Sequence, residues 1–155
     1  KFTGMRRRFQ IIGEHKNAKI VDDYAHHPTE IEATLKTARN IISSQGEGRI
    51  IAVFQPHRYS RFSTFWNDFK QCFTNADELY VCDVYSASEK PVENVNSENF
   101  AREIDHKMAC YVKGNLEEVA EKVYPNIKPY DIVLTLGAGN ITKLGNILIE
   151  KINTK

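Results

Sequence analysis

Short apolar runs alternate with longer amphipathic segments along most of this chain. The short runs are rich in β-branched residues, and several are continuously apolar, as strands covered on both faces are. They predict strands at residues 8–13, 18–23, 49–55, 78–85, 108–113 and 131–136. The amphipathic segments predict helices at residues 28–43, 60–75, 97–105, 116–124 and 140–152.

The first expected helix shows the clearest periodicity. Four apolar residues at helical spacing form one stripe that should be buried: Ile31, Leu35, Ala38 and Ile42. Pro28 suits the first helical position, and Glu30 in the first turn favours the positive end of the helix dipole.

The order of the elements predicts an α/β fold in three layers. The connection at residues 14–17 is short enough for a hairpin, so the first two strands should pair antiparallel. The remaining strands alternate with helices, as parallel strands with right-handed crossovers do. We therefore expect a mostly parallel sheet of about six strands with an antiparallel edge, in a single domain spanning residues 1–155.

Composition excludes several classes of protein. Lys plus Arg number 21 against 20 for Asp plus Glu, so no overall charge would attract nucleic acid or a membrane, and any anion site must be local. Three cysteines without a CxxC spacing argue against a disulfide scaffold or a zinc knuckle. No apolar run approaches the roughly 18 residues of a membrane span, and no signal-like leader is present, so we expect a cytoplasmic protein. The chain begins with Lys1 rather than Met, which is compatible with a piece of a longer polypeptide.

Three polar loops follow predicted strands, and ligands of open α/β sheets bind beyond the carboxyl ends of strands. The loops read "YAHHP" at residues 24–28, "PHRYSR" at 56–61 and "GAGN" at 137–140. Because parallel strands end at the same edge of a sheet, we expect these loops to share one rim.

The second loop is a candidate anion site. His57, Arg58 and Arg61 lie near the start of a predicted helix, where guanidinium groups and unpaired amides together can bind a carboxylate or a phosphate. The alternative is a solvated basic loop in which Ser60 caps the helix. Three consecutive arginines, Arg6 to Arg8, are a further basic cluster, but alternation along a strand points Arg7 and Arg8 in opposite directions.

The third loop is rich in glycine at a strand-to-helix junction. Gly137, Ala138 and Gly139 would let backbone approach a ligand closely, although a tight turn has the same composition. Thr142 stands where a GxGxxG motif needs its third glycine, and the P-loop pattern GxxxxGK[ST] is absent from the sequence.

The stretch "DDYAHHP" leaves three interpretations open. Asp22, Asp23, His26 and His57 could hold a metal ion, as in a small hydrolase, but their spacing is not that of HExxH. Asp23 could accept hydrogen bonds from ribose hydroxyl groups at a strand end. In the structural alternative, one aspartate accepts turn amides and one histidine caps the helix.

Five segments, taken in order, resemble the carboxyl-terminal domain of the Mur ligase family of peptidoglycan synthesis. They are "RRRF", "VDDYAHHPTEI", "AVFQPHRYSR", "VYSASEKP" and "DIVLTLGAGNI", and the resemblance runs from about Gly4 to the end. It is greatest to the members that join L-alanine to UDP-N-acetylmuramate. The resemblance implies a Rossmann-like domain of a three-domain enzyme, whose P-loop lies in a central ATPase domain and whose UDP-sugar site lies in an amino-terminal domain.

The resemblance also implies a reaction. ATP with Mg²⁺, bound mainly by the central domain, would convert the muramoyl carboxylate to an acyl phosphate, and the amine of L-alanine would displace phosphate through a tetrahedral intermediate. The partners would be UDP-N-acetylmuramate, L-alanine and ATP, with no nucleic acid or membrane. Residues 1–155 alone should be inactive.

Site residues carry over from the family position by position. Its pattern of Arg-Phe with an aspartate fourteen residues after the phenylalanine is met by Arg8, Phe9 and Asp23. By similarity Arg8 would reach the ATP phosphates and Asp23 the ribose, while Tyr24 and His26 would line the nucleotide or acceptor side. Ala25 stands where some members carry a lysine, so that phosphate contact is not implied here.

The basic loop would serve the acceptor in such an enzyme. His57, Arg58 and Arg61 would hold its carboxylate, and His26, Arg58 and Arg61 would stabilise the charge that develops during attack. The loop of Gly137, Ala138 and Gly139 would close the same pocket.

Two alternatives accompany this interpretation besides the metal-dependent hydrolase. One is the related ligase that recycles murein tripeptide, which shares a similar histidine turn but is not expected to carry "FQPHRYSR". The other is a stand-alone nucleotide-binding module, which tight ATP binding by the isolated chain would support.

Overall fold

The computed structural model describes residues 7–154, and Arg6 lies outside this range. Its sheet has six strands in the order β1-β2-β6-β3-β4-β5. The strands are β1 (Gln10–His15), β2 (Ala18–Asp23), β3 (Ile50–Phe54), β4 (Glu78–Cys82), β5 (Ala109–Val112) and β6 (Ile132–Leu136). β1 pairs antiparallel with β2, and every other pairing in the sheet is parallel. The predicted α/β fold with an antiparallel edge is therefore confirmed.

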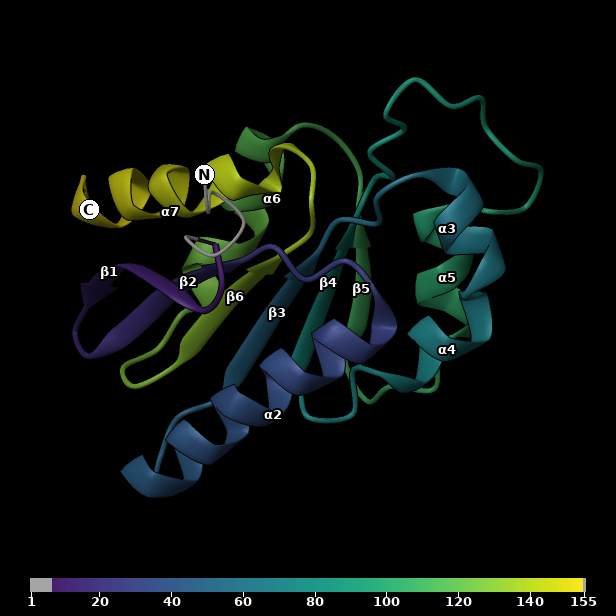
Figure 1. Cartoon of the computed structure of the whole chain (residues 1–155). Coiled ribbons are helices and arrows are strands. Elements are labelled where there is room, and N and C mark those ends of the chain that lie inside the picture. The colour runs from purple at the N-terminus through teal and green to yellow at the C-terminus, as the bar shows by residue number, and fades with distance from the viewer. Residues whose placement is uncertain (1–6, 155) are drawn as a thin grey trace.

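Helices cover both faces of the sheet (Figure 1). One face carries α2 (Pro28–Gln45), α3 (Tyr59–Thr64), α4 (Trp66–Gln71) and α5 (Ser97–Glu103). The other carries α6 (Leu116–Val123) and α7 (Leu144–Asn153), with the short 3₁₀ helices η1 (Tyr124–Asn126) and η2 (Asn140–Lys143) next to them. Among residues 7–154, no helix has the length and apolar character needed to cross a bilayer.

The alternation of β3 shows how the two cores form. Ile50, Ala52 and Phe54 belong to the cluster beneath α2 to α5, whereas Ile51 and Val53 belong to the cluster beneath α6 and α7. Successive strand side chains point to opposite faces, so a continuously apolar strand supplies both cores.

Helix α2 follows the sequence pattern closely. The predicted stripe is buried, and Pro28 occupies the first turn. His27 caps the helix, since its side chain accepts a hydrogen bond from the Thr29 amide, and Glu30 completes a capping box. Gly46 ends the helix in the left-handed region at φ 84°, two residues later than predicted.

Two helices that were predicted to be continuous are each divided in the structure. The helix predicted at residues 60–75 divides into α3 and α4 at Phe65, whose ring contacts the His27 ring with centroids 4.6 Å apart. Helical hydrogen bonds still cross the break, from the Phe65 amide to Arg61 and from the Phe69 amide to Phe65. The helix predicted at residues 140–152 begins as η2 and becomes α-helical only at Leu144.

β1 and β4 differ most from the predicted bounds, while β3, β5 and β6 differ by one residue at one or both ends. β1 starts at Gln10 instead of residue 8, because Phe9 has φ 45° and donates its amide to the Asp23 side chain. The hairpin then turns through Lys16 and Asn17, both at positive φ. β4 stops at Cys82 instead of residue 85, and Tyr85 forms a separate parallel bridge with His57.

Candidate functional site

The base of the candidate site is a saturated ion pair at the end of β2. Asp22 is 2% exposed and accepts two hydrogen bonds from Arg7, from Nε at 2.8 Å and Nη2 at 3.3 Å. The hydroxyl groups of Thr135 and Thr142 donate to the same carboxylate at 2.7 and 2.9 Å. Asp22 is therefore a structural anchor, although its donors are side chains and not the turn amides that the structural alternative for this stretch predicted.

Arg7 extends this anchor to two rim loops. Its Nη2 donates to the Gly137 carbonyl at 2.7 Å, and its guanidinium lies 5.1 Å from the centroid of the Tyr24 ring. The Tyr24 amide in turn donates to the Arg7 carbonyl. The sequence pointed to Arg8 in this cluster; Arg8 is exposed, and the internal contacts belong to its neighbour.

Asp23 fastens the segment before β1 to the end of β2. It is 5% exposed, and its carboxylate accepts hydrogen bonds from the amides of Phe9 and Ala25, both at 2.8 Å, and from the Thr34 hydroxyl at 3.2 Å. Both carboxylate oxygens thus have donors within the domain. A ribose hydroxyl would have to donate to oxygens that already accept these bonds, and the ribose contact stays a prediction.

The histidine turn divides its two imidazoles between two tasks. His27 is the cap of α2, whereas the His26 ring contacts the Tyr24 ring at 5.0 Å and the His57 ring at 6.2 Å between centroids. Burial opposes ionisation of Glu30, but hydrogen bonds from the amides of His26 and His27 and the charges of His26 and Arg8 outweigh it and lower the pKa of this carboxyl. The second histidine of the pair is therefore structural, and the first faces the rim.

The basic loop and the segment after β4 form one unit. The Arg58 amide donates to the Tyr85 carbonyl, and the Tyr85 amide donates to the Pro56 carbonyl, each at 2.8 Å. The His57 ring stacks on the Tyr85 ring with centroids 5.5 Å apart and planes inclined by 9°. Arg58 is held at φ 75°, a conformation that is unfavourable for a residue other than glycine.

Electrostatics in this loop favour a neutral imidazole between cations. Arg61 lies 3.2 Å from His57 Nδ1 and donates to the His57 carbonyl at 3.0 Å. Burial lowers the pKa of His57 below its usual 6.5, and the charges of Arg61, His26 and Arg58 lower it further. The two guanidinium groups give this part of the rim donors of the kind that bind a carboxylate or a phosphate.

Gly137 and Gly139 pack closely against neighbouring residues because they have no side chain. A Cβ atom on Gly137 would lie 2.8 Å from the Gln55 carbonyl oxygen, and one on Gly139 would lie 2.6 Å from the Tyr85 ring. Buried Gln55 bridges the same loop, donating to Asn140 at 2.7 Å and accepting the Ile141 amide at 3.2 Å. The loop is thereby fixed against the ends of β3 and β6, and Ala138 between the two glycines is half-buried.

These contacts bring most expected residues to one rim. Tyr24, His26, His57, Arg58 and Arg61 lie within a continuous chain of ring and hydrogen-bond contacts, and the glycine loop adjoins Tyr85. Beside them is a hollow of about 190 Å³ at the ends of β4 and β5. Its polar lining comprises Gln55, Asp83, Tyr85, Asn115 and Asn140.

Sequence reasoning missed four residues of this arrangement: Arg7, Gln55, Tyr85 and Glu89, whose carboxylate accepts the Ser60 amide and hydroxyl at the start of α3. Tyr85 and Glu89 lie in "VYSASEKP", a segment that the resemblance had already singled out, so their position in a family motif was an available signal. Half-buried Arg7 and buried Gln55 also lie in quoted segments, "RRRF" and "AVFQPHRYSR", but they contact loops far away in the sequence, so the motifs alone do not indicate what they do.

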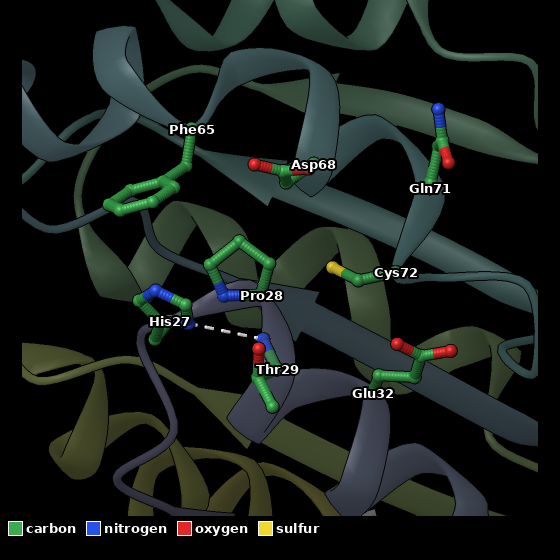
Figure 2. Close-up of a pocket in the computed structure, with 8 residues that line it drawn as sticks. All are labelled: His27, Pro28, Thr29, Glu32, Phe65, Asp68, Gln71 and Cys72. Atoms are coloured by element: carbon green, nitrogen blue, oxygen red, sulfur yellow. Dashed lines mark hydrogen bonds between the residues drawn. The ribbon is translucent and has the colours of Figure 1, made fainter.

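A larger polar pocket, about 320 Å³, lies outside the rim (Figure 2). Figure 2 shows His27 and Glu32 from α2 and its cap on one side, and Phe65, Asp68 and Cys72 on the other. Each expected site residue lies within the described range, and none of them lines this pocket. The rim is the stronger candidate because it joins cationic, aromatic and amide groups at the ends of parallel strands.

A metal centre has no support from the arrangement of residues 7–154. No group of three or more His, Cys, Asp or Glu side chains in this range is placed to hold a metal ion. Asp22 and Asp23, two of the four ligands considered for that site, already accept hydrogen bonds from internal donors.

The fold and the rim describe a Rossmann-like domain with exposed cationic groups at one edge of the sheet, and a family comparison identifies the class. Residues 7–139 match the family described as "Mur ligase, glutamate ligase domain". The chain belongs to the Mur ligase family.

Curated relatives narrow the comparison to one kind of ligase. The chain is 40% identical over 158 residues to UDP-N-acetylmuramate–L-alanine ligase of Rickettsia felis, covering 99% of this chain and 33% of that protein. It is 42% identical over 154 residues to the ligase of the same name from Rickettsia bellii, covering 97% of this chain and 32% of that protein. The chain thus spans about a third of the length of the curated relatives it matches.

Solved structures agree on the fold. The UDP-N-acetylmuramate–alanine ligase of Thermotoga maritima superposes with a TM-score of 0.73 at 26% identity, covering 96% of this chain and 30% of that one. A murein peptide ligase from Psychrobacter arcticus superposes with a TM-score of 0.68 at 16% identity, covering 97% of this chain and 30% of that one. The second similarity shows the fold alone.

Proposed function

We propose that this chain is the carboxyl-terminal domain of an ATP-dependent ligase that joins L-alanine to UDP-N-acetylmuramate. The observation that carries the proposal is the cationic part of the rim, where Arg58, Arg61 and neutral His57 lie beside the histidine turn. The names and identities of the relatives support the same activity.

On the acceptor side, the basic loop would bind the carboxylate of L-alanine. The Arg58 side chain is 46% exposed, so its guanidinium is accessible to a ligand. A bound carboxylate would orient the amine for attack on the acyl phosphate, and the guanidinium groups would stabilise the negative charge of the tetrahedral intermediate. His26, on the neighbouring turn, would line the same space.

On the nucleotide side, we assign Arg8 to the ATP phosphates and Tyr24 to the edge of the nucleotide site. Both side chains are exposed. Asp23, already bonded within the domain, would hold the turn that presents Tyr24 and His26, and a ribose hydroxyl would donate to carboxylate oxygens that also accept from these internal donors. Gly137, Ala138 and Gly139 would close the pocket between the two sides.

Mg²⁺ and the triphosphate grip would come from other domains of the ligase. Residues 7–154 hold no group of three or more His, Cys, Asp or Glu side chains placed to bind a metal ion, and the sequence lacks a P-loop, so we assign Mg²⁺ mainly to the central domain. UDP-N-acetylmuramate would also bind outside it. Because the reaction uses ATP, we place the enzyme in the cytoplasm.

The proposal is tested with residues 1–155 and with the full-length ligase. The isolated domain should bind ATP weakly in calorimetry and release no ADP with UDP-N-acetylmuramate and L-alanine, whereas the full-length enzyme should release ADP in an alanine-dependent reaction. Alanine-dependent ADP release by the isolated domain would contradict the division of labour. Nanomolar to micromolar ATP binding by it would support the stand-alone module instead.

Substrate choice separates the two ligase alternatives. The relatives at about 40% identity carry the L-alanine ligase name, while the murein peptide ligase shares only the fold. We therefore expect full-length enzyme to use free L-alanine and to leave murein tripeptide unused. Faster turnover with the tripeptide would favour the recycling ligase.

A further inference from the structure

Glu89 lies on the long segment between β4 and α5, which arcs away from the body of the domain above α3 (Figure 1). We propose that Glu89 is a positioning residue that holds Arg58 in the orientation that receives the carboxylate of the acceptor amino acid. This inference rests on the proposed function, because it takes Arg58 as part of that receptor.

The backbone of Arg58 is in a strained conformation. A non-glycine residue at φ 75° needs surrounding contacts to keep it there. The two backbone hydrogen bonds between residues 56–58 and Tyr85 supply part of that restraint. They also make the conformation of Arg58 depend on the position of the segment after β4.

Glu89 fixes the segment after β4 against the start of α3. Arg58 is the N-cap residue of α3, and its own side chain makes no capping hydrogen bond. Glu89 supplies the cap from 29 residues away: Oε1 accepts the Ser60 amide at 2.9 Å and Oε2 accepts the Ser60 hydroxyl at 2.6 Å. This carboxylate clamps the segment onto the start of α3, immediately after the strained residue.

The charge of Glu89 also acts on the Arg58 side chain. Glu89 Oε2 lies 3.5 Å from Arg58 Nη1, so the carboxylate aligns the guanidinium through one nitrogen and leaves its other donors for a ligand. Hydrogen bonds from the Ser60 hydroxyl and amide, assisted by Arg58, lower the pKa of Glu89 and keep it ionised. Glu89 thus orients the receptor without saturating it.

Steady-state kinetics of the full-length ligase test this role. We expect Glu89→Ala to raise KM for L-alanine roughly threefold to tenfold and to lower kcat by a smaller factor, since the guanidinium remains but is less well oriented towards the acceptor and the tetrahedral intermediate. Glu89→Gln can still accept from Ser60 but carries no charge, so its KM should be intermediate. The control is Glu93→Ala, an exposed carboxylate on the same segment, which should leave KM unchanged.

A double-mutant cycle shows whether Glu89 acts through Arg58. In an Arg58→Ala background, Glu89→Ala should add nothing to KM. Hydrogen exchange of the isolated domain should show faster exchange at the Ser60 amide in Glu89→Ala than in Glu93→Ala, with the same melting temperature.

Several outcomes would overturn the inference. A fall in KM for Glu89→Ala would mean that Glu89 competes with the substrate carboxylate, and an unchanged KM or additive effects in the cycle would mean that it does not act through Arg58. If Arg58→Ala raises KM and Glu89→Ala does not, only the positioning role fails. If Arg58→Ala itself leaves KM unchanged, the proposed receptor fails, and the inference fails with it.

Discussion

The two ends of the parallel strands use the same kinds of charged residue in opposite ways. At the amino-terminal end, Arg49 donates to Asp131, to Glu78 at 2.5 Å and to the Asn126 carbonyl at 2.6 Å. Asp131 is 1% exposed and also accepts the amides of Arg49 and Lys128. The guanidinium and the carboxylates there bind one another.

At the carboxyl-terminal end, such internal pairing of charged groups is concentrated at the base of the rim. Asp22 and Asp23 accept hydrogen bonds from internal donors, but above them Arg58 remains nearly half exposed, and burial and neighbouring cations lower the pKa of His57. The difference teaches that a charged residue at a strand end is not in itself a sign of a site. Charge that the domain leaves available to a ligand is the better sign.

The largest expected effect is at the amino-terminal end. Asp131→Ala leaves Arg49 partly buried without its main partner and should lower the free energy of unfolding by about 3 kcal/mol or more. Urea denaturation of residues 1–155 measures it. The control is Arg102→Ala, which breaks an exposed ion pair on α5 and should change stability by less than about 0.5 kcal/mol. Similar losses in both variants would show that burial of the network is unimportant.

The next effect separates the base of the rim from its surface. Arg7→Ala should destabilise the domain by about 1.5–3 kcal/mol, because buried Asp22 loses a charged donor while the two threonine hydroxyls remain. Exposed Arg8→Ala should cost less than about 0.5 kcal/mol in the same urea experiment. Equal effects would place both arginines in one role and reject the distinction.

At the surface of the rim we expect loss of binding without loss of stability. Arg58→Ala in the full-length ligase should raise KM for L-alanine about tenfold, the lower part of the range for a charge-assisted contact, because this side chain is nearly half exposed. Kinetics measure KM, and urea denaturation of the domain should be unchanged. A destabilised variant with a normal KM for L-alanine would show that Arg58 has a structural role, like Arg49, and does not bind the substrate.

The smallest effect is the pH response of His57. Its folded-state pKa is lowered, so the unfolded chain takes up the proton first as pH falls. The associated stability is present above the usual value of about 6.5 and is lost as pH falls from there through the lowered pKa. Melting temperatures at several pH values should therefore decline less below pH 6.5 in His57→Gln than in the parent. Parallel curves would contradict the lowered pKa.

Much of the fold could be predicted from periodicity. The stripe on α2 and the apolar strands identified the layers, since burial on one or both faces leaves a direct trace in the sequence. Ends of elements were less accessible, because β1 and β4 are bounded by tertiary contacts at Phe9 and Tyr85. A local pattern contains no record of such contacts.

For the candidate site, the sequence located the loops but not the partners of each side chain. It placed His57, Arg58 and Arg61 at a strand end, where the structure has them. It could not tell Arg7 from Arg8, because the choice depends on a threonine pair and a carbonyl more than a hundred residues away. The clamp by Glu89 was equally hidden, since it joins two loops through one carboxylate.

The guanidinium of Arg7 has a mechanical consequence. It fastens the chain to β2 and the loop after β6, near the middle of the sheet, before the polypeptide reaches the edge strand β1. A force transmitted to Arg7 is therefore shared between β2, one strand of the hairpin, and the loop after β6, and does not act on β1 alone. The loops that follow β2 and β6 would then move together.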